Sequence, residues 1–165
     1  MAARTQTLIA AALMLLGAAC SDTTPPVEAR ATVTVPDTVV ASQLSVSAEQ
    51  WMQFTIPVSI RNTASVPLTF FLCGTRIEAQ NAGVWTNVWS PICSLSAGSD
   101  SPILPGETRA VTMTITASVA GAGGPLWGNA SVAGTYRLNA ALIPEGFSGT
   151  IPTISSNAFT LKQGQ

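Results

Sequence analysis

The chain has 165 residues, of which 47% are hydrophobic and only 9% charged, which excludes a disordered tail and a charged coiled coil. Seven basic and eight acidic residues are spread singly along the chain, so no basic cluster is present to bind nucleic-acid phosphates. The sequence contains no histidine, the commonest general base and zinc ligand, and we expect neither an enzyme nor a metal or cofactor site.

The first predicted element is an export signal over residues 1–19. One cation, Arg4, precedes an uncharged run from Leu8 to Ala19, which has only 12 residues. A helix that spans a bilayer needs about 20 apolar residues, so the length favours a cleaved signal over a retained anchor helix. Two small residues before Cys20 resemble the signal of bacterial lipoproteins, in which this cysteine is acylated and becomes the new N-terminus. The alternative is an ordinary cleaved signal that leaves Cys20 free.

The resemblance to lipoproteins implies membrane attachment at the N-terminus. Ser21, and not aspartate, follows the cysteine, which by the same resemblance favours the outer over the inner membrane. Residues 20–30 are polar and include Pro25 and Pro26, a composition typical of an extended tether. We expect one folded domain over residues 31–165.

Two cysteines, Cys73 and Cys93, remain for that domain. Export places them in an oxidising compartment, where an even number of cysteines usually pairs. A metal site or a redox pair is disfavoured, because the spacing is not Cys-x-x-Cys and no histidine is available as a further ligand. We predict a structural disulfide between them.

From Ala31 onward the sequence alternates between apolar and polar residues, which predicts half-buried strands. A hairpin is expected around Asn81-Ala82-Gly83, and a type II turn at Pro105-Gly106. Pro57 cannot donate to a strand ladder and predicts an edge or a bulge. Seven to nine short strands without a helical period predict an all-β fold, an antiparallel β-sandwich. The expected strands cover residues 31–35, 44–48, 54–60, 67–73, 77–80, 84–89, 111–116, 136–142 and 158–162.

Several turn and core positions resemble the bacterial immunoglobulin-like domains that are attached to exported proteins. The similarity covers roughly residues 50 to 162 and extends, more weakly, to the small β-sandwich proteinase inhibitors of bacteria. It implies an immunoglobulin-like fold and no reaction, with Tyr136 in the place of a tyrosine corner. The positions that carry it are Asn62, Ile77-Glu78, Gly83-Val84-Trp85, Val88, Leu104-Pro105-Gly106 and Gly134-Thr135-Tyr136-Arg137-Leu138.

Aromatic residues supply the candidate binding sites. Trp85 and Trp89 are four apart on one predicted strand, and we expect them on the same face, about 13 Å apart, where they either pack into the core or stack on sugar rings. Trp127 follows Leu126 within a Gly- and Ala-rich loop at residues 119–133. It can plug the end of the sandwich or anchor a partner, and we hypothesise the second role.

These features predict an envelope lipoprotein whose immunoglobulin-like domain is a protein-binding or structural module. The protein partner would contact the surface around Leu126 and Trp127. The alternatives are a glycan-binding module, which needs Trp85 and Trp89 to be exposed, and a proteinase inhibitor, which needs a rigid projecting loop.

Overall fold

The computed structural model describes residues 30–46, 49–93, 101–118, 125–129 and 131–164. The predicted signal, Cys20 and all of the tether except Arg30 lie outside these residues. The described chain is all-β, with one short 3-10 turn, η2 (Leu72–Gly74), and it contains no helix able to cross a membrane. The ten strands are β1 (Ala31–Thr34), β2 (Thr38–Val46), β3 (Glu49–Asn62), β4 (Leu68–Phe70), β5 (Arg76–Asn81), β6 (Val84–Trp89), β7 (Thr108–Ser118), β8 (Gly134–Pro144), β9 (Thr153–Ser155) and β10 (Phe159–Gln163).

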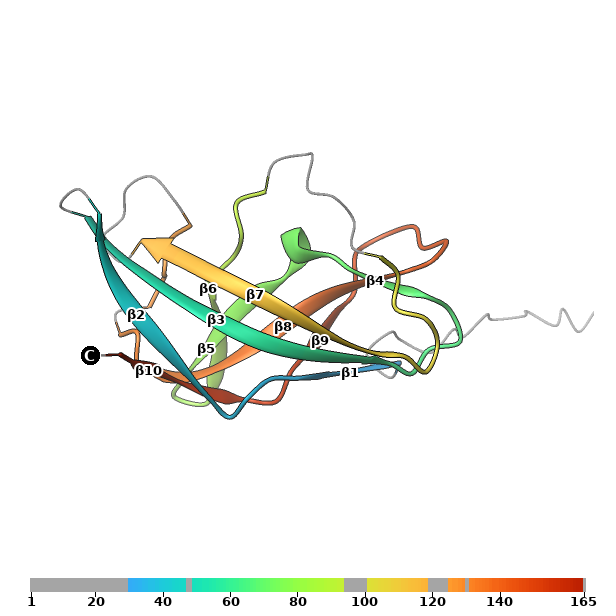
Figure 1. The fold of residues 1–165 in the computed structure, drawn as a ribbon, viewed down its shortest axis with the longest axis horizontal. Coiled ribbons are helices and arrows are strands. Elements are labelled where there is room, and N and C mark those ends of the chain that lie inside the picture. Colours follow the sequence, from blue (N-terminus) through green and yellow to red (C-terminus); the bar gives the residue numbers. More distant parts are fainter. Residues whose placement is uncertain (1–29, 47–48, 94–100, 119–124, 130, 165) are drawn as a thin grey trace, which may run out of the picture.

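The strands form two layers, each built on one long strand (Figure 1). In the first layer, β3 pairs with β7 along one edge, from Trp51 opposite Ser118 to Arg61 opposite Thr108. Its other edge is shared by β2 and β1. In the second layer, β8 pairs with β5 and β4 on one edge and with β10 and β9 on the other, and β6 extends the layer beyond β5.

The layers are connected by β2, which pairs with a strand of each. Residues 38–41 of β2 pair with β10, whereas residues 42–46 pair with β3. The pairing with β10 is parallel, so the expectation of a wholly antiparallel arrangement is wrong at this pair. The number of strands is also larger than expected, because β9, a three-residue strand, pairs with the middle of β8.

The core lies between the layers and follows the alternation in the sequence. On β3 the even-numbered residues from Met52 to Ile60 are buried, while Thr55 and Pro57 on the opposite face are exposed. Each Å² of apolar surface removed from water stabilises the fold by about 25 cal/mol, so the buried face of this alternation supplies the main stabilising free energy. The buried inward residues of the two long strands are Met52, Phe54, Ile56, Val58, Ile60, Tyr136, Leu138, Ala140 and Leu142.

The predicted turns are confirmed. The hairpin between β5 and β6 closes through Ala82 (φ 49°) and Gly83 (φ 83°), the two positive φ angles that a type I′ turn requires. Gly106 has φ 78° within a turn in which the Glu107 N–H donates to the Leu104 carbonyl at 2.9 Å. Pro57 lies in the interval of β3 that neither β1 nor β2 covers, so its missing N–H interrupts no ladder on that edge.

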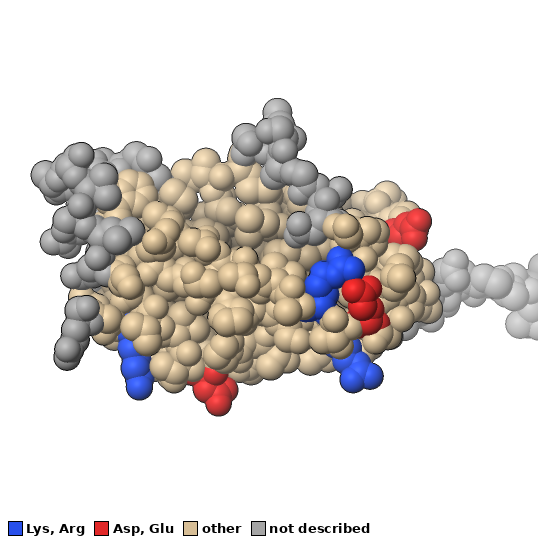
Figure 2. Space-filling model, in the orientation of Figure 1, with Lys and Arg blue, Asp and Glu red and all other residues tan. Residues whose placement is uncertain are grey.

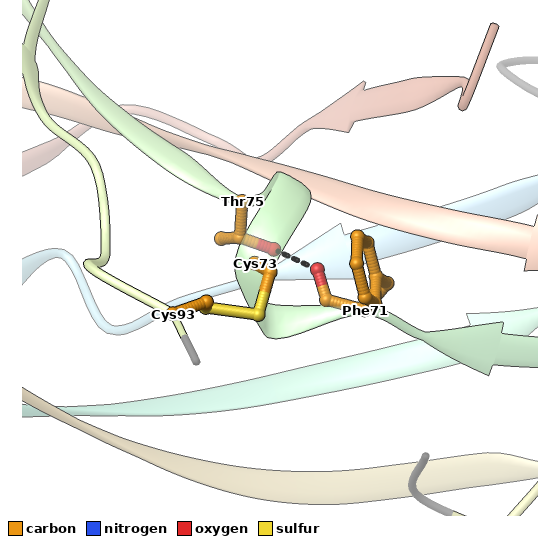
Figure 3. The surroundings of a disulfide bond; sticks show 4 residues. All are labelled: Phe71, Cys73, Thr75 and Cys93. Atoms are coloured by element: carbon orange, nitrogen blue, oxygen red, sulfur yellow. Dashed lines mark hydrogen bonds between the residues drawn. A yellow bond between two sulfur atoms is a disulfide. The ribbon is translucent and has the colours of Figure 1, made fainter. Parts of the chain in front are cut away.

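The expected strand at residues 67–73 is cut short by the turn that carries the disulfide. Cys73 and Cys93 are bonded, with their Cα atoms 5.8 Å apart, which confirms the predicted pair. Thr75 ends the turn: its hydroxyl donates to the Phe71 carbonyl at 3.1 Å (Figure 3). The same hydroxyl accepts from the Ala141 N–H at 3.2 Å. The disulfide therefore ties the segment after β6 to a turn that is held against β8.

Removal of this disulfide is expected to destabilise the fold without changing it. The bond closes a loop with a sequence separation of 20, which corresponds to about 3 kcal/mol of unfolding free energy in the chain-entropy description. Cys73→Ala with Cys93→Ala should therefore lower the urea midpoint with little change in the slope of the transition. An unchanged midpoint would show that the bond contributes no stability.

Candidate functional site

The segment at residues 125–128 closes one side of the molecule by bonding to both layers. The Ser118 N–H donates to the Pro125 carbonyl at 2.9 Å, and the Trp127 N–H donates to the Ser118 carbonyl at 3.0 Å, which sets the segment parallel to the end of β7. The Gly128 N–H then donates to the Val88 carbonyl of β6 at 2.8 Å. The described end of the Gly- and Ala-rich loop is thus a bridge between β7 and β6.

Trp127 points from this bridge into the core. It is only 5% exposed, and its ring centroid lies 5.7 Å from that of Phe54, edge to face, and 5.3 Å from that of Tyr136. Its indole N–H has no hydrogen-bond partner among the described residues. Our hypothesis that Trp127 is the anchor for a partner is therefore wrong, because the backbone pairing on either side of it directs the side chain between the layers.

Tyr136 fixes the strand that receives Trp127. Its hydroxyl donates to the upstream backbone, 2.9 Å from the Val132 carbonyl oxygen and 3.0 Å from that of Ser131, and it accepts from the Asn129 side chain at 3.1 Å. Burial raises the pKa of this phenol above its ordinary value, and the bond from Asn129 lowers it in part. The hydroxyl thus ties the start of β8 to the backbone four and five residues upstream.

The two tryptophans of β6 lie on opposite faces of the second layer, contrary to expectation. Glu78 pairs with Asn87 but Ile77 pairs with Trp89, so Val88 is an extra residue in the strand. Such a bulge reverses the alternation of side chains beyond it. Trp89 therefore points inward with Ile77 and is 4% exposed, and a sugar platform formed by both tryptophans is excluded.

Trp85, on the outer face, is half-buried and already has a partner. The Arg137 guanidinium lies 4.6 Å from the centre of its ring, a cation–π contact. The same guanidinium forms an ion pair with Glu78, with Nη2 2.6 Å from Oε2. Arginine thus covers one face of the only tryptophan that points outward from β6.

Beside the bridge, a group of apolar side chains is exposed in a pocket that polar residues also line. Leu126 is 55% exposed and Ile92 is 71% exposed, and both line a shallow pocket together with Pro91 and Pro125. We call these four residues the seam patch, because they lie where β6 meets the bridge. Leu126 was a candidate from sequence, whereas Ile92 was not, since no periodic pattern extends past the end of β6 to mark it.

One acidic residue, Glu107, holds the turn before β7. Glu107 accepts from the Leu104 N–H at 2.7 Å and pairs with Arg109 at 2.7 Å. The Leu104 hydrogen bond, and then Arg109, lower the pKa of Glu107. Within the described ranges, no three cysteine or acidic side chains come together as a metal site would need.

No protein-family model and no curated protein matches the chain. Among the solved structures that resemble it are three that share 19% identity or less with it. The structural genomics target SoR45 is 16% identical with a TM-score of 0.49, covering 82% of this chain and 89% of that one. The putative ApaA protein from Bordetella pertussis is 19% identical with a TM-score of 0.41, covering 82% and 94%. The N-terminal domain of PorA is 14% identical with a TM-score of 0.32, covering 82% and 100%.

Truncation of two neighbouring side chains of the bridge should change the stability of the protein to very different extents. Trp127→Ala removes a buried aromatic and should cost about 3 to 5 kcal/mol of unfolding free energy. Leu126→Ala, one residue earlier and exposed, should leave the free energy of unfolding within about 0.5 kcal/mol of wild type. Urea unfolding monitored by circular dichroism measures both. A stable Trp127→Ala protein would contradict the burial of this side chain.

Proposed function

We propose that this protein is an exported, lipid-anchored module of the bacterial cell envelope, with an immunoglobulin-like β-sandwich that binds another protein. The binding surface is the seam patch. The observation that carries the proposal is the exposure of Leu126 and Ile92, two large apolar side chains that line one pocket, whereas the candidates Trp89 and Trp127 are buried.

The strand order supports the immunoglobulin-like assignment. Two layers built on β3 and β8 face each other, and a strand near the N-terminus changes layers by pairing in parallel with the last strand, β10. The Tyr136 hydroxyl bonds to upstream backbone at the start of β8, as in the tyrosine corner of such domains.

The disulfide supports export, because such bonds persist in oxidising compartments and are rare in the cytosol. The sequence around Cys20 supports lipid attachment at a short polar tether ahead of β1. Ser21 after the cysteine favours the outer membrane. A lipid at this position would hold the domain close to the membrane and to other envelope proteins.

The physical chemistry of the seam patch favours a protein over a glycan. Aliphatic side chains and prolines gain free energy by losing contact with water, whereas sugars are usually recognised by aromatic faces with polar groups around them. Truncation of a buried anchor in a protein interface commonly costs 2 kcal/mol or more. We do not propose a glycan site, since Trp89 is in the core and Arg137 covers one face of Trp85.

Lipid attachment can be tested by metabolic labelling. Cells that express the wild-type protein and are grown with radiolabelled palmitate should incorporate label into it, and the Cys20→Ala protein should carry none. A Cys73→Ala protein, which also lacks one cysteine, is the matched control and should stay labelled. Equal labelling of wild type and Cys20→Ala would refute the anchor.

Binding at the seam patch can be tested with a charge placed in it. Leu126→Asp should reduce the yield of co-purified envelope proteins after chemical crosslinking by about tenfold, since a desolvated carboxylate opposes apolar contact. Val84→Asp is the control, because Val84 is 63% exposed at the distant hairpin turn. If both variants retain the wild-type partners, the seam patch is not the binding surface.

A further inference from the structure

We infer that the outer edge of β7 binds an extended peptide segment of a partner protein as an added strand. This inference rests on the proposed function, a protein-binding module, and assigns it a second surface apart from the seam patch. The segment would pair with residues 110–114 of β7 and direct apolar side chains into the groove between the layers.

The pairing of β7 leaves one edge open. The backbone N–H and C=O groups of Ser118 point away from β3, because they bond to the bridge. In a regular antiparallel pair these directions alternate along the strand, so the backbone groups of every second residue before Ser118 also point away from β3. The Thr116 carbonyl also points away from β3, since it accepts from the Trp89 indole at 3.4 Å. The backbone N–H and C=O groups of Ala110, Thr112 and Thr114 point the same way, and none of them has a hydrogen-bond partner in the described part of the chain.

This edge lacks the features that protect other edge strands. Residues 110–116 contain no charged residue, proline or glycine, and their pairing with β3 continues without a bulge. Figure 2 shows the charged side chains in the right part and along the lower border of this face of the molecule, with none over its middle and upper left. A regular, uncharged edge with three free pairs of backbone groups is suited to strand addition.

A groove beside the edge indicates what the added strand would carry. Its apolar lining is Phe70 and Ile103 from the second layer and Val111 from β7, and Ser101, Arg109 and Ala110 complete it. Arg109 holds the rim in place, because its guanidinium donates to the Ser101 and Pro102 carbonyls. In a strand added to this edge, alternate side chains would point into the groove, where apolar groups fit.

The chain itself provides an example of this mode at the other end of the same edge. Residues 125–127 pair with Ser118 of β7 as an extended segment, and the Trp127 side chain enters the space between the layers. The free stretch at residues 110–114 continues this edge. An extended segment with an apolar side chain therefore fits the continuation better than a folded surface does.

The test uses the full-length lipidated protein in detergent micelles and a labelled heptapeptide in which threonine and valine alternate around a central tryptophan. Fluorescence anisotropy should show binding, and amide exchange followed by NMR should show Ala110, Thr112 and Thr114 unprotected before the peptide is added and protected afterwards. The same peptide with N-methyl groups on alternate amides should not bind, because it cannot form the ladder.

Two matched proline variants locate the site. Thr112→Pro removes an edge N–H and should weaken binding at least about tenfold, the loss expected when a buried hydrogen bond and the ladder around it are disrupted. Thr55→Pro is the control, because Thr55 is also exposed and, opposite Thr114, directs its N–H to the far edge of β3. The affinity of the Thr55→Pro protein for the peptide should stay within about twofold of that of the wild type.

Each other outcome overturns the inference. Protection of the three amides before peptide is added would mean that the edge is already covered. Absence of binding at millimolar peptide, or equal effects of both proline variants, would exclude strand addition at β7. Self-association of the protein that Thr112→Pro abolishes would assign the edge to a second copy of the chain. Because none of these variants touches Cys20 or the seam patch, such a failure leaves the proposed function to be judged by its own tests.

Discussion

Trp127 lies between the two layers, in edge contact with Phe54 of β3 and beside Tyr136 of β8, and this contact determines which surfaces the protein can offer to a partner. The indole closes the core where β7 and β6 would otherwise be separated. Within the described ranges its N–H has no hydrogen-bond partner, and the large apolar ring is removed from water. Because the ring is committed to the core, the flanking Leu126 is the large apolar side chain of the bridge that stays exposed.

The two sides of the molecule are closed differently. On one side, β2 pairs with β10 and carries the chain from one layer to the other. On the other side, the bridge at residues 125–128 covers only the end of β7, and the middle of that strand has no further pairing partner among the residues that the structure describes. The seam patch and the β7 edge both lie on this incompletely closed side. Closure by one short segment therefore produces both candidate surfaces.

One inserted residue decides the role of the β6 tryptophans. Without the bulge at Val88, Trp85 and Trp89 would share a face and could form a platform. With it, Trp89 joins the core and donates to the Thr116 carbonyl, and Trp85 stacks under Arg137 on the outside. The ion pair between Arg137 and Glu78 joins β8 to β5 on that same outer face, so the charges near Trp85 support the sheet.

The sequence by itself determined the features that depend on neighbours in the chain. Alternation of apolar and polar residues gave the strands and the buried face of β3, and the positive-φ requirements of tight turns gave the turns at Gly83 and Gly106. The pairing of Cys73 with Cys93 was predicted from their number and from the expected export signal.

Tertiary structure decided what depends on pairing partners distant in sequence. The parallel contact of β2 with β10 and the bulge at Val88 depend on register between strands, which local patterns do not encode. Whether Trp127 is core or surface depended on hydrogen bonds from its bridge to Ser118 and Val88, nine and 39 residues away from it in sequence. An aromatic residue among glycines and alanines is compatible with either role, and only the space between the layers selects one, because that space removes the ring from water.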